Sequence, residues 1–121
     1  MILRKSSGTS DINQNVSLLP AKFAPNKFGN FGESGKNTRI IKCRDPISES
    51  AEFYEMIGRG GEIRGIPGKE GTITKLDDRS EITYRVITRT ENSPAVEINV
   101  KKANANINGQ KIHFIKENQN D

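Results

Sequence analysis

Four side chains that can transfer protons or bind phosphate occur in three short segments of the C-terminal half: Arg85, Glu97, Lys111 and His113. All four occupy odd positions, and the even positions around them are mostly apolar. Because side chains alternate along a strand, this pattern places the four on one face of a sheet, opposite the apolar face. An imidazole, a carboxylate, a guanidinium and an ammonium on one face are sufficient to cleave RNA without a metal ion.

RNA carries its own nucleophile, the 2′-OH, so a protein needs only proton-transfer groups and cations around the phosphate. His113 is the first candidate for acid or base, because histidine is the side chain whose unperturbed pKa lies near neutrality. Glu97 is the candidate for the other proton transfer. Arg85 and Lys111 would stabilise the charge that develops on the non-bridging oxygens. Such a site requires neither a cofactor nor a metal.

Two plainer interpretations fit the same residues. The face could simply be solvated, with cross-strand ion pairs that contribute roughly a few tenths of a kcal/mol each. His113 would then be an ordinary surface histidine on a strand. If the face has no catalytic role, the domain would bind nucleic acid or protein without cleaving it, or it would be a structural module that binds a partner.

A hydroxyl-rich segment follows the strand that holds Arg85, with Thr88 and Thr90 close to Ser93. Its hydroxyl groups could bind a phosphate or a ribose, although a plain turn accounts for them almost as well. Arg89 and Lys101 share the odd parity of the predicted site. We therefore include both among the candidate substrate-binding residues.

Other motifs argue against further chemistry. One cysteine, Cys43, cannot form an internal disulfide, and one cysteine with one histidine cannot build a closed zinc site. The segment Gly58-Arg59-Gly60-Gly61 fits the end of a helix better than a phosphate-binding loop, because phosphate loops usually begin a helix.

The elements that must position the site begin with one helix. Asp45 suits the N-cap and Pro46 the first helical position. Apolar spacing continues for about three turns until the glycines at 58–61. The residues expected on its buried stripe are Ser50, Phe53, Tyr54 and Ile57.

After the helix the pattern alternates and predicts four strands, at 71–76, 81–89, 95–101 and 111–116. Their even-numbered apolar residues would pack on the helix; these are Ile82, Tyr84, Val86, Val96, Ile98, Val100, Ile112 and Phe114. The fold class is therefore α+β, with one main helix packed on a four-stranded antiparallel β-meander. Residues 38–42 could add an edge strand.

Length and composition limit the rest of the chain. Its 121 residues suit one domain, and no apolar run is long enough to span a membrane. Residues 1–47 hold eight basic against three acidic side chains, whereas residues 48–121 hold 11 against 12. We expect residues 1–36, rich in Ser, Gly, Asn and Pro, to form an extended arm before a domain at 37–121. The apolar residues Leu18, Leu19, Phe23, Phe28 and Phe31 suggest that part of this arm wraps over the domain or is gripped by a partner.

Over residues 37–115 the chain resembles the C-terminal toxin domains of bacterial polymorphic toxins, many of which are similar to the barnase, EndoU, colicin and RelE group of RNases. The segments that carry the resemblance are 37–41, 51–54 leading to 60–61, 82–85, 88–94, 96–99 and 110–114. The resemblance carries over Arg85, Thr88, Thr90, Lys111 and His113 as matching positions. Similar chains can have arginine in place of His113, which would make that position a phosphate ligand and bring Arg85 and Thr88 closer to the chemistry.

The resemblance implies an interbacterial toxin, secreted as the C-terminal part of a larger effector by a contact-dependent or related system. It would act in the cytoplasm of the target cell, without a membrane-embedded part. The implied activity is metal-independent endoribonuclease cleavage, often of tRNA, by transesterification at the 2′-OH. The implied partners are RNA and a cognate immunity protein, and whether a host translation factor takes part stays open.

Overall fold

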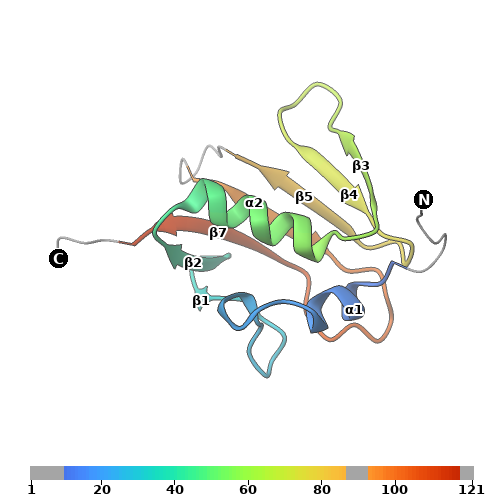
Figure 1. Ribbon diagram of the computed structural model, residues 1–121, viewed down its shortest axis with the longest axis horizontal. Coiled ribbons are helices and arrows are strands. Elements are labelled where there is room, and N and C mark those ends of the chain that lie inside the picture. Colours follow the sequence, from blue (N-terminus) through green and yellow to red (C-terminus); the bar gives the residue numbers. More distant parts are fainter. Residues whose placement is uncertain (1–9, 87–92, 118–121) are drawn as a thin grey trace.

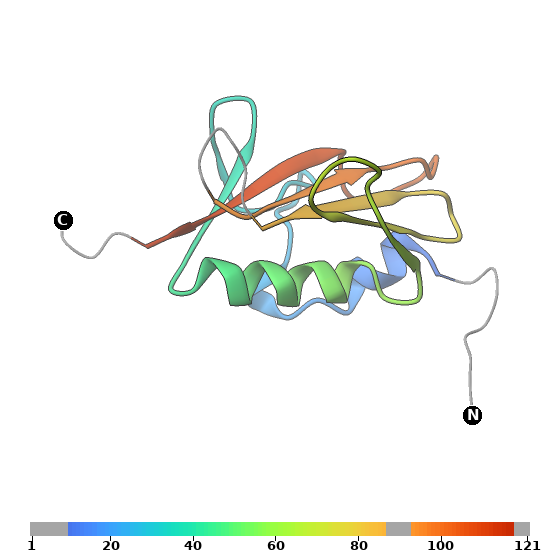
Figure 2. The same ribbon diagram turned by 90° about the horizontal axis from the view of Figure 1, so that it is seen from above.

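The structure, a computed structural model, describes residues 10–86 and 93–117. Within these ranges the chain is an α+β fold in which a mixed sheet of seven strands is covered on one side by the long helix α2 (Figures 1 and 2). The elements are α1 (Ile12–Ser17), the 3₁₀ turn η1 (Ala21–Phe23), β1 (Glu33–Ser34), β2 (Arg39–Cys43), α2 (Pro46–Ile57), β3 (Glu62–Gly65), β4 (Thr72–Lys75), β5 (Glu81–Arg85), β6 (Ala95–Asn99) and β7 (Gln110–Lys116).

The sheet has the strand order β1-β2-β7-β6-β5-β4-β3. The prediction of an α+β fold is confirmed, but a four-stranded antiparallel meander with one main helix is wrong in detail. Strands β4 to β7 are antiparallel neighbours, yet β3 extends the sheet on one side and β2 pairs parallel with β7 on the other. Strand β2 corresponds to the strand suggested at 38–42, although β1 and not β2 forms the edge. Strands β3 and β1 gave no alternating signal, because β3 is exposed at all four positions and β1 has only two residues.

Helix α2 starts and ends where the sequence predicts. The Asp45 side chain accepts a hydrogen bond from the Ser48 amide, at 3.2 Å, and Pro46 opens the first turn. The Gly58 amide donates to the Tyr54 carbonyl at 3.0 Å and closes the helix. The four residues predicted on the buried stripe, Ser50, Phe53, Tyr54 and Ile57, are all buried.

The core between α2 and the sheet is centred on Phe53. Its ring centroid lies 5.4 Å from that of Phe23, 5.1 Å from Phe31 and 5.7 Å from Phe114. Two of these contacts are edge-to-face, an arrangement that stabilises aromatic pairs beyond the area they bury. Residues from the N-terminal segment and from β7, the last strand along the chain, therefore share one core.

The N-terminal segment packs on the domain, as the apolar residues Phe23 and Phe31 suggested, and is not extended throughout. Between residues 10 and 36 it forms α1 and η1 and places Ile12, Phe23 and Phe31 in the core with at most 2% exposure. The buried side chain of Asn15 donates from Nδ2 to the Ile57 carbonyl at 2.8 Å and to the Arg59 carbonyl at 3.0 Å. This amide satisfies the carbonyls at the end of α2 that the helix cannot pair itself.

Hydroxyl groups join α2 to the sheet inside the core. The Tyr54 hydroxyl accepts hydrogen bonds from Thr72 at 2.9 Å and from Thr74 at 2.6 Å. The Tyr84 hydroxyl lies 2.9 Å from that of Ser50, and the two tyrosine rings stack with centroids 4.9 Å apart. Polar atoms at this interface are paired, as burial requires.

The end of the Arg85 strand also differs from the prediction. Strand β5 stops at Arg85, so Val86, predicted to face the core, is 43% exposed. The rest of the predicted strand, 87–89, lies outside the described residues. Tyr84 and Val100 are only partly buried against the core.

Candidate functional site

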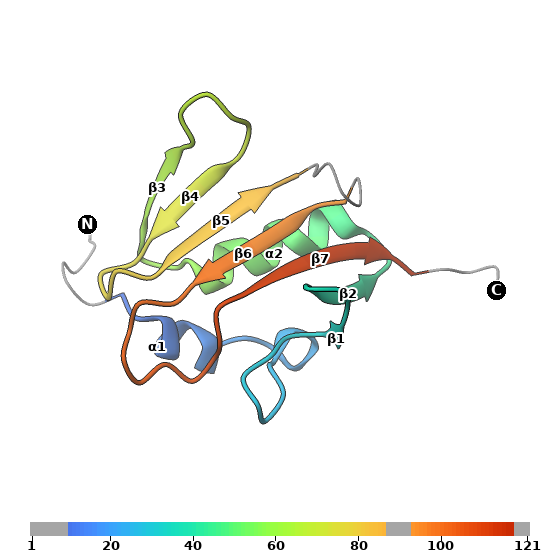
Figure 3. The same ribbon diagram turned by 180° about the vertical axis from the view of Figure 1, so that it is seen from behind.

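Four of the predicted site residues, Arg85, Glu97, Lys111 and His113, belong to the outer face of the sheet, which we define as the face opposite α2 (Figures 2 and 3). The strand register arranges them in two neighbouring rows. In one row Arg85 lies opposite Ala95 and Ala95 opposite His113. In the other, Thr83 lies opposite Glu97 and Glu97 opposite Lys111. The strand register therefore places Arg85, Glu97, Lys111 and His113 on one face of the sheet, as the alternation of the sequence predicts.

Glu97 and Lys111 form a directly opposed pair of opposite charge. Glu97 is exposed, and Lys111 is half-buried. Directly opposed residues of an antiparallel pair have Cβ atoms about 5 Å apart. A carboxylate and an ammonium at this spacing can both reach one phosphodiester group.

Arg85 lies in the next row and is held close to the backbone. Its Cγ atom would be 3.0 Å from a Cβ atom added to Gly71, whose φ is +112°. The Nε atom of Arg85 is buried and has no hydrogen-bond partner among the residues that the structure describes. An anionic ligand would therefore have to bind the terminal nitrogens of this half-buried guanidinium, because Nε is closed to solvent.

His113 is on the predicted face, but its ring is buried there, which does not fit the direct acid or base role expected from its residue type. Its side chain is 1% exposed, and Nδ1 lies 3.0 Å from the Ser93 hydroxyl, which is itself buried. The ring lies between Ile40 of β2 and Ala95 of β6, which are the residues opposite His113 on its two neighbouring strands. In this conformation the imidazole cannot exchange a proton directly with a bound substrate.

Two candidate substrate-binding residues occupy other places. Ser93 is buried and contacts His113 instead of facing solvent. Lys101 is exposed but lies beyond Asn99, where β6 ends, and its amide donates to the Ser80 hydroxyl at 3.2 Å. Lys101 is therefore not brought to the Arg85 row. The candidates Thr88, Arg89 and Thr90 lie outside the described residues.

Charge on the rest of the outer face is mixed. Lys75 of β4 lies opposite Glu62 of β3 on one side and Glu81 of β5 on the other. Lys42 of β2 is 3.8 Å from the Glu33 carboxylate of β1. Lys75 and Lys42 thus each have an acidic neighbour on this face. Arg85 and Lys111 lie in the two rows described above, where the acidic residue is Glu97.

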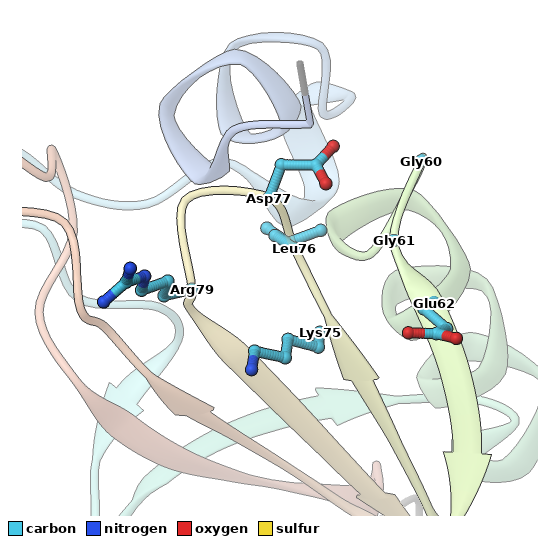
Figure 4. Close-up of a pocket in the computed structure, with 7 residues that line it drawn as sticks. All are labelled: Gly60, Gly61, Glu62, Lys75, Leu76, Asp77 and Arg79. Atoms are coloured by element: carbon cyan, nitrogen blue, oxygen red, sulfur yellow. The ribbon is translucent and has the colours of Figure 1, made fainter. Parts of the chain in front are cut away.

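One cavity lies away from this group, at the end of the sheet where β3 and β4 meet α2 (Figure 4). Its volume is about 680 Å³, and it is lined by Gly60, Gly61, Glu62, Lys75, Leu76, Asp77 and Arg79. Asp77 Oδ2 is already bonded to the amide and the hydroxyl of Ser10, at 2.9 and 2.7 Å. In the sequence these residues indicate only a turn and the end of a helix, and we assign the cavity no chemistry.

Two other possible chemistries find no support. Among residues 10–86 and 93–117 no group of three or more His, Cys, Asp or Glu side chains is placed to hold a metal ion. Burial raises the pKa of the Cys43 thiol to about 11, and the nearby carboxylates of Glu49 and Asp45 add to the effect. Since the thiolate is the nucleophilic form, Cys43 is unreactive at neutral pH.

Comparisons with known proteins identify no relative. No family model, no curated protein and no solved structure matches the chain. Within the described part of the chain, no helix has the length and apolar character needed to cross a bilayer. The function must therefore be argued from the residues of the outer face.

Proposed function

We propose that the chain is an interbacterial toxin domain that acts as a metal-independent endoribonuclease, with tRNA as the preferred substrate. The observation that carries the proposal is the register, which aligns the Glu97–Lys111 pair beside Arg85 on one face. These are the groups that transesterification at a 2′-OH requires: a base, and cations for the phosphorane.

In the proposed reaction the exposed Glu97 carboxylate removes the proton of the 2′-OH. The 2′-oxygen then forms a bond to phosphorus, the bond from phosphorus to the 5′-oxygen breaks, and the 5′-oxygen takes a proton from the Lys111 ammonium or from water. The products are a 2′,3′-cyclic phosphate and a 5′-hydroxyl. Arg85 binds the non-bridging oxygens through the terminal nitrogens of its half-buried guanidinium.

His113 takes a different part in this proposal from the one its residue type suggests. Its buried ring and the Ser93 hydroxyl form a hydrogen-bonded pair at the end of the row that holds Arg85 and Ala95. We assign the pair a positioning role, in which it fixes the packing beside Ala95, the residue that separates His113 from Arg85. Proton transfer is assigned to Glu97.

The biological setting follows from the resemblance in residues 37–115. The domain would be secreted as the C-terminal part of a larger effector and would act in the cytoplasm of the target cell. A cognate immunity protein would neutralise it there. A host translation factor that presents the RNA is a further partner of this proposal.

The test is incubation of the purified chain with total RNA in EDTA, followed by sequencing of the new RNA ends. We expect fragments with a 2′,3′-cyclic phosphate and a 5′-hydroxyl. Glu97→Gln should lower the rate about 10²- to 10⁴-fold, the range for loss of one general base. Glu81→Gln is the matched control, because Glu81 is on the same face but lies opposite Asn99 and Lys75. Equal activity of the two variants would contradict the assignment of Glu97.

A second candidate is a non-catalytic module that binds nucleic acid or protein as part of a secreted effector. The observations that favour it are the burial of His113 and the mixed charge of the outer face. RNA that is bound but acquires no new ends would support this candidate. Expression of the chain in bacteria without an immunity protein would then be harmless.

A further inference from the structure

Strand β3 forms one edge of the sheet, and within the described part of the chain its only neighbour along the sheet is β4. All four of its residues are exposed. Figures 1 and 3 show the β3–β4 hairpin projecting from the body of the domain. A Cβ atom added at Gly65 or Gly68 would meet no heavy atom within 4 Å apart from those of its chain neighbours. An edge strand presents unpaired backbone N–H and C=O groups, to which a further strand can bind.

The two edges of the sheet differ in how well they are protected against such pairing. Proteins protect an edge with a very short strand, a proline, a bulge or inward-pointing charges. The β1 edge has only two residues, which is a protected edge of the first kind. Strand β3 has four residues, contains no proline and pairs with β4 without a bulge. It also holds Ile63, whose side chain is 63% exposed. The β3 edge is therefore open to a further strand.

The side chains of β3 alternate between the two faces of the sheet. Ile63 lies opposite Thr74, whose hydroxyl donates to the Tyr54 hydroxyl of α2, so Ile63 is on the α2 side. Glu62 and Arg64 are therefore on the outer face. A strand that pairs with β3 must complement one carboxylate and one guanidinium, with an apolar residue between them on the other face.

A second copy of β3 provides this complement when it runs antiparallel with Ile63 opposite Ile63. In that register Glu62 of each copy lies opposite Arg64 of the other. Directly opposed residues of opposite charge stabilise an antiparallel pair, whereas like charges destabilise it. A shift of one residue leaves both charges without a charged partner. A shift of two residues sets Arg64 opposite Arg64, or Glu62 opposite Glu62.

We infer that β3 pairs antiparallel with β3 of a second copy of the chain and joins the two sheets into one, with both α2 helices on the same side. The inference goes beyond the proposed function and does not depend on it, because Arg85, Glu97 and Lys111 lie on other strands. Stable interfaces have about 20–30 residues on each side, and β3 has four, so we expect a weak dimer with a Kd in the micromolar to millimolar range.

The first experiment measures this Kd by sedimentation velocity over a wide range of protein concentrations. Arg64→Glu and Glu62→Arg each set like charges opposite one another at two places, and each should raise the Kd about 10- to 100-fold. The double variant Glu62→Arg, Arg64→Glu restores both opposed pairs and should recover the original Kd. Glu55→Arg is the matched control, because it makes the same change of charge at an exposed position of α2. It should leave the Kd unchanged.

Mixing the two single variants tests whether the charges pair between copies. Glu62→Arg has two arginines where Arg64→Glu has two glutamates, so the two chains complement one another in the proposed register. An equimolar mixture should dimerise under conditions in which each variant alone is a monomer. A fault inside one chain, such as repulsion between the new arginine and Lys75 on β4, could not be repaired by mixing.

A cross-link tests the register directly. Directly opposed residues have Cβ atoms about 4.5–5.5 Å apart, close to the spacing of a disulfide. Ile63→Cys should therefore form a covalent dimer on mild oxidation, seen on a non-reducing gel. Glu55→Cys is the control, since it also retains Cys43, and it should remain a monomer.

The results can overturn the inference in two ways. A chain that stays monomeric at every concentration, with no cross-link through Ile63→Cys, would overturn it and leave the β3 edge to a strand of a different protein. A dimer whose Kd is the same in Arg64→Glu, Glu62→Arg and the unmodified chain would also overturn it, because the interface would then lie elsewhere.

Discussion

Replacement of Tyr54 by phenylalanine tests the hydroxyl pairing between α2 and the sheet. The substitution keeps the ring and its stacking on Tyr84 but removes the oxygen that accepts from Thr72 and Thr74. The Thr74 side chain is 1% exposed, so water cannot replace the lost acceptor, whereas Thr72 is half-buried. One buried unsatisfied hydroxyl costs about 1–3 kcal/mol, and we expect Tyr54→Phe to lower the free energy of unfolding by about 2 kcal/mol.

Tyr84→Phe is the matched control for this change. It removes a hydroxyl that contacts only Ser50 among the described residues, and the Ser50 hydroxyl keeps its bond to the Ile47 carbonyl at 3.1 Å. No buried group is left unpaired, so the expected cost is about 0.5–1.5 kcal/mol, that of an ordinary hydrogen bond. The double variant Tyr54→Phe, Thr74→Val removes both partners and should recover part of the loss.

The assay is urea denaturation followed by circular dichroism, because the chain has no tryptophan to report unfolding. A cost of about 2 kcal/mol should also lower the melting temperature by roughly 6–12 °C in a domain of this size. The reasoning is refuted if Tyr54→Phe costs no more than Tyr84→Phe, or if adding Thr74→Val costs stability instead of restoring it.

Three further predictions concern single residues. Asn15→Ala should lower the free energy of unfolding by about 1–3 kcal/mol, because the Ile57 and Arg59 carbonyls lose their donor. Asn15→Asp should lower the free energy of unfolding more at pH 7 than at pH 3, since only the protonated acid can donate a hydrogen bond. Urea denaturation at both pH values checks this. Cys43 should react with iodoacetamide at pH 8 about 10- to 200-fold more slowly than in the unfolded chain, because its pKa of about 11 keeps the thiol protonated. The reaction rate should rise with pH up to about pH 11. A rate at pH 8 equal to that of the unfolded chain would contradict the burial of this thiol. A hydrogen bond from Lys102 at 2.9 Å lowers the pKa of Asp11, so the stabilisation from this carboxylate is present above its unfolded pKa near 4 and is lost as pH falls through the lower folded value. Asp11→Asn, which can still cap α1, should therefore destabilise the chain at pH 7 and have little effect at pH 2, again by urea denaturation.

Local signals were sufficient to predict part of the fold. Asp45, Pro46 and the glycines from Gly58 onward fixed the ends of α2, because caps act within one turn. Alternation located the four strands β4 to β7 and placed Arg85, Glu97, Lys111 and His113 on one face. The apolar residues of the N-terminal segment indicated that part of it wraps over the domain, but its helix and turns were not predicted, since Ile12, Phe23 and Phe31 are spaced irregularly.

The burial of His113 could not be predicted from its own segment. The ring contacts Ser93 and has Ile40 of β2 opposite it, and β2 pairs with β7 only after the chain has made α2 and five other strands. The parallel pairing leaves no turn motif, because its strands are not joined by a hairpin. The hydrogen bonds of the Tyr54 hydroxyl could not be predicted either, because they join α2 to β4 and the sequence does not show how these two elements pack together.

Strand β7 occupies the interior of the sheet although it is the last strand described along the chain. Its pairing with β2 joins Arg39 to Ile112, and Phe114 completes the aromatic core around Phe53. A ribosome would therefore release nearly all of the described residues before the central pairing could form, and contacts this distant in sequence slow folding. Synthesis of the chain should yield an open, protease-sensitive nascent polypeptide that becomes resistant only once β7 has emerged.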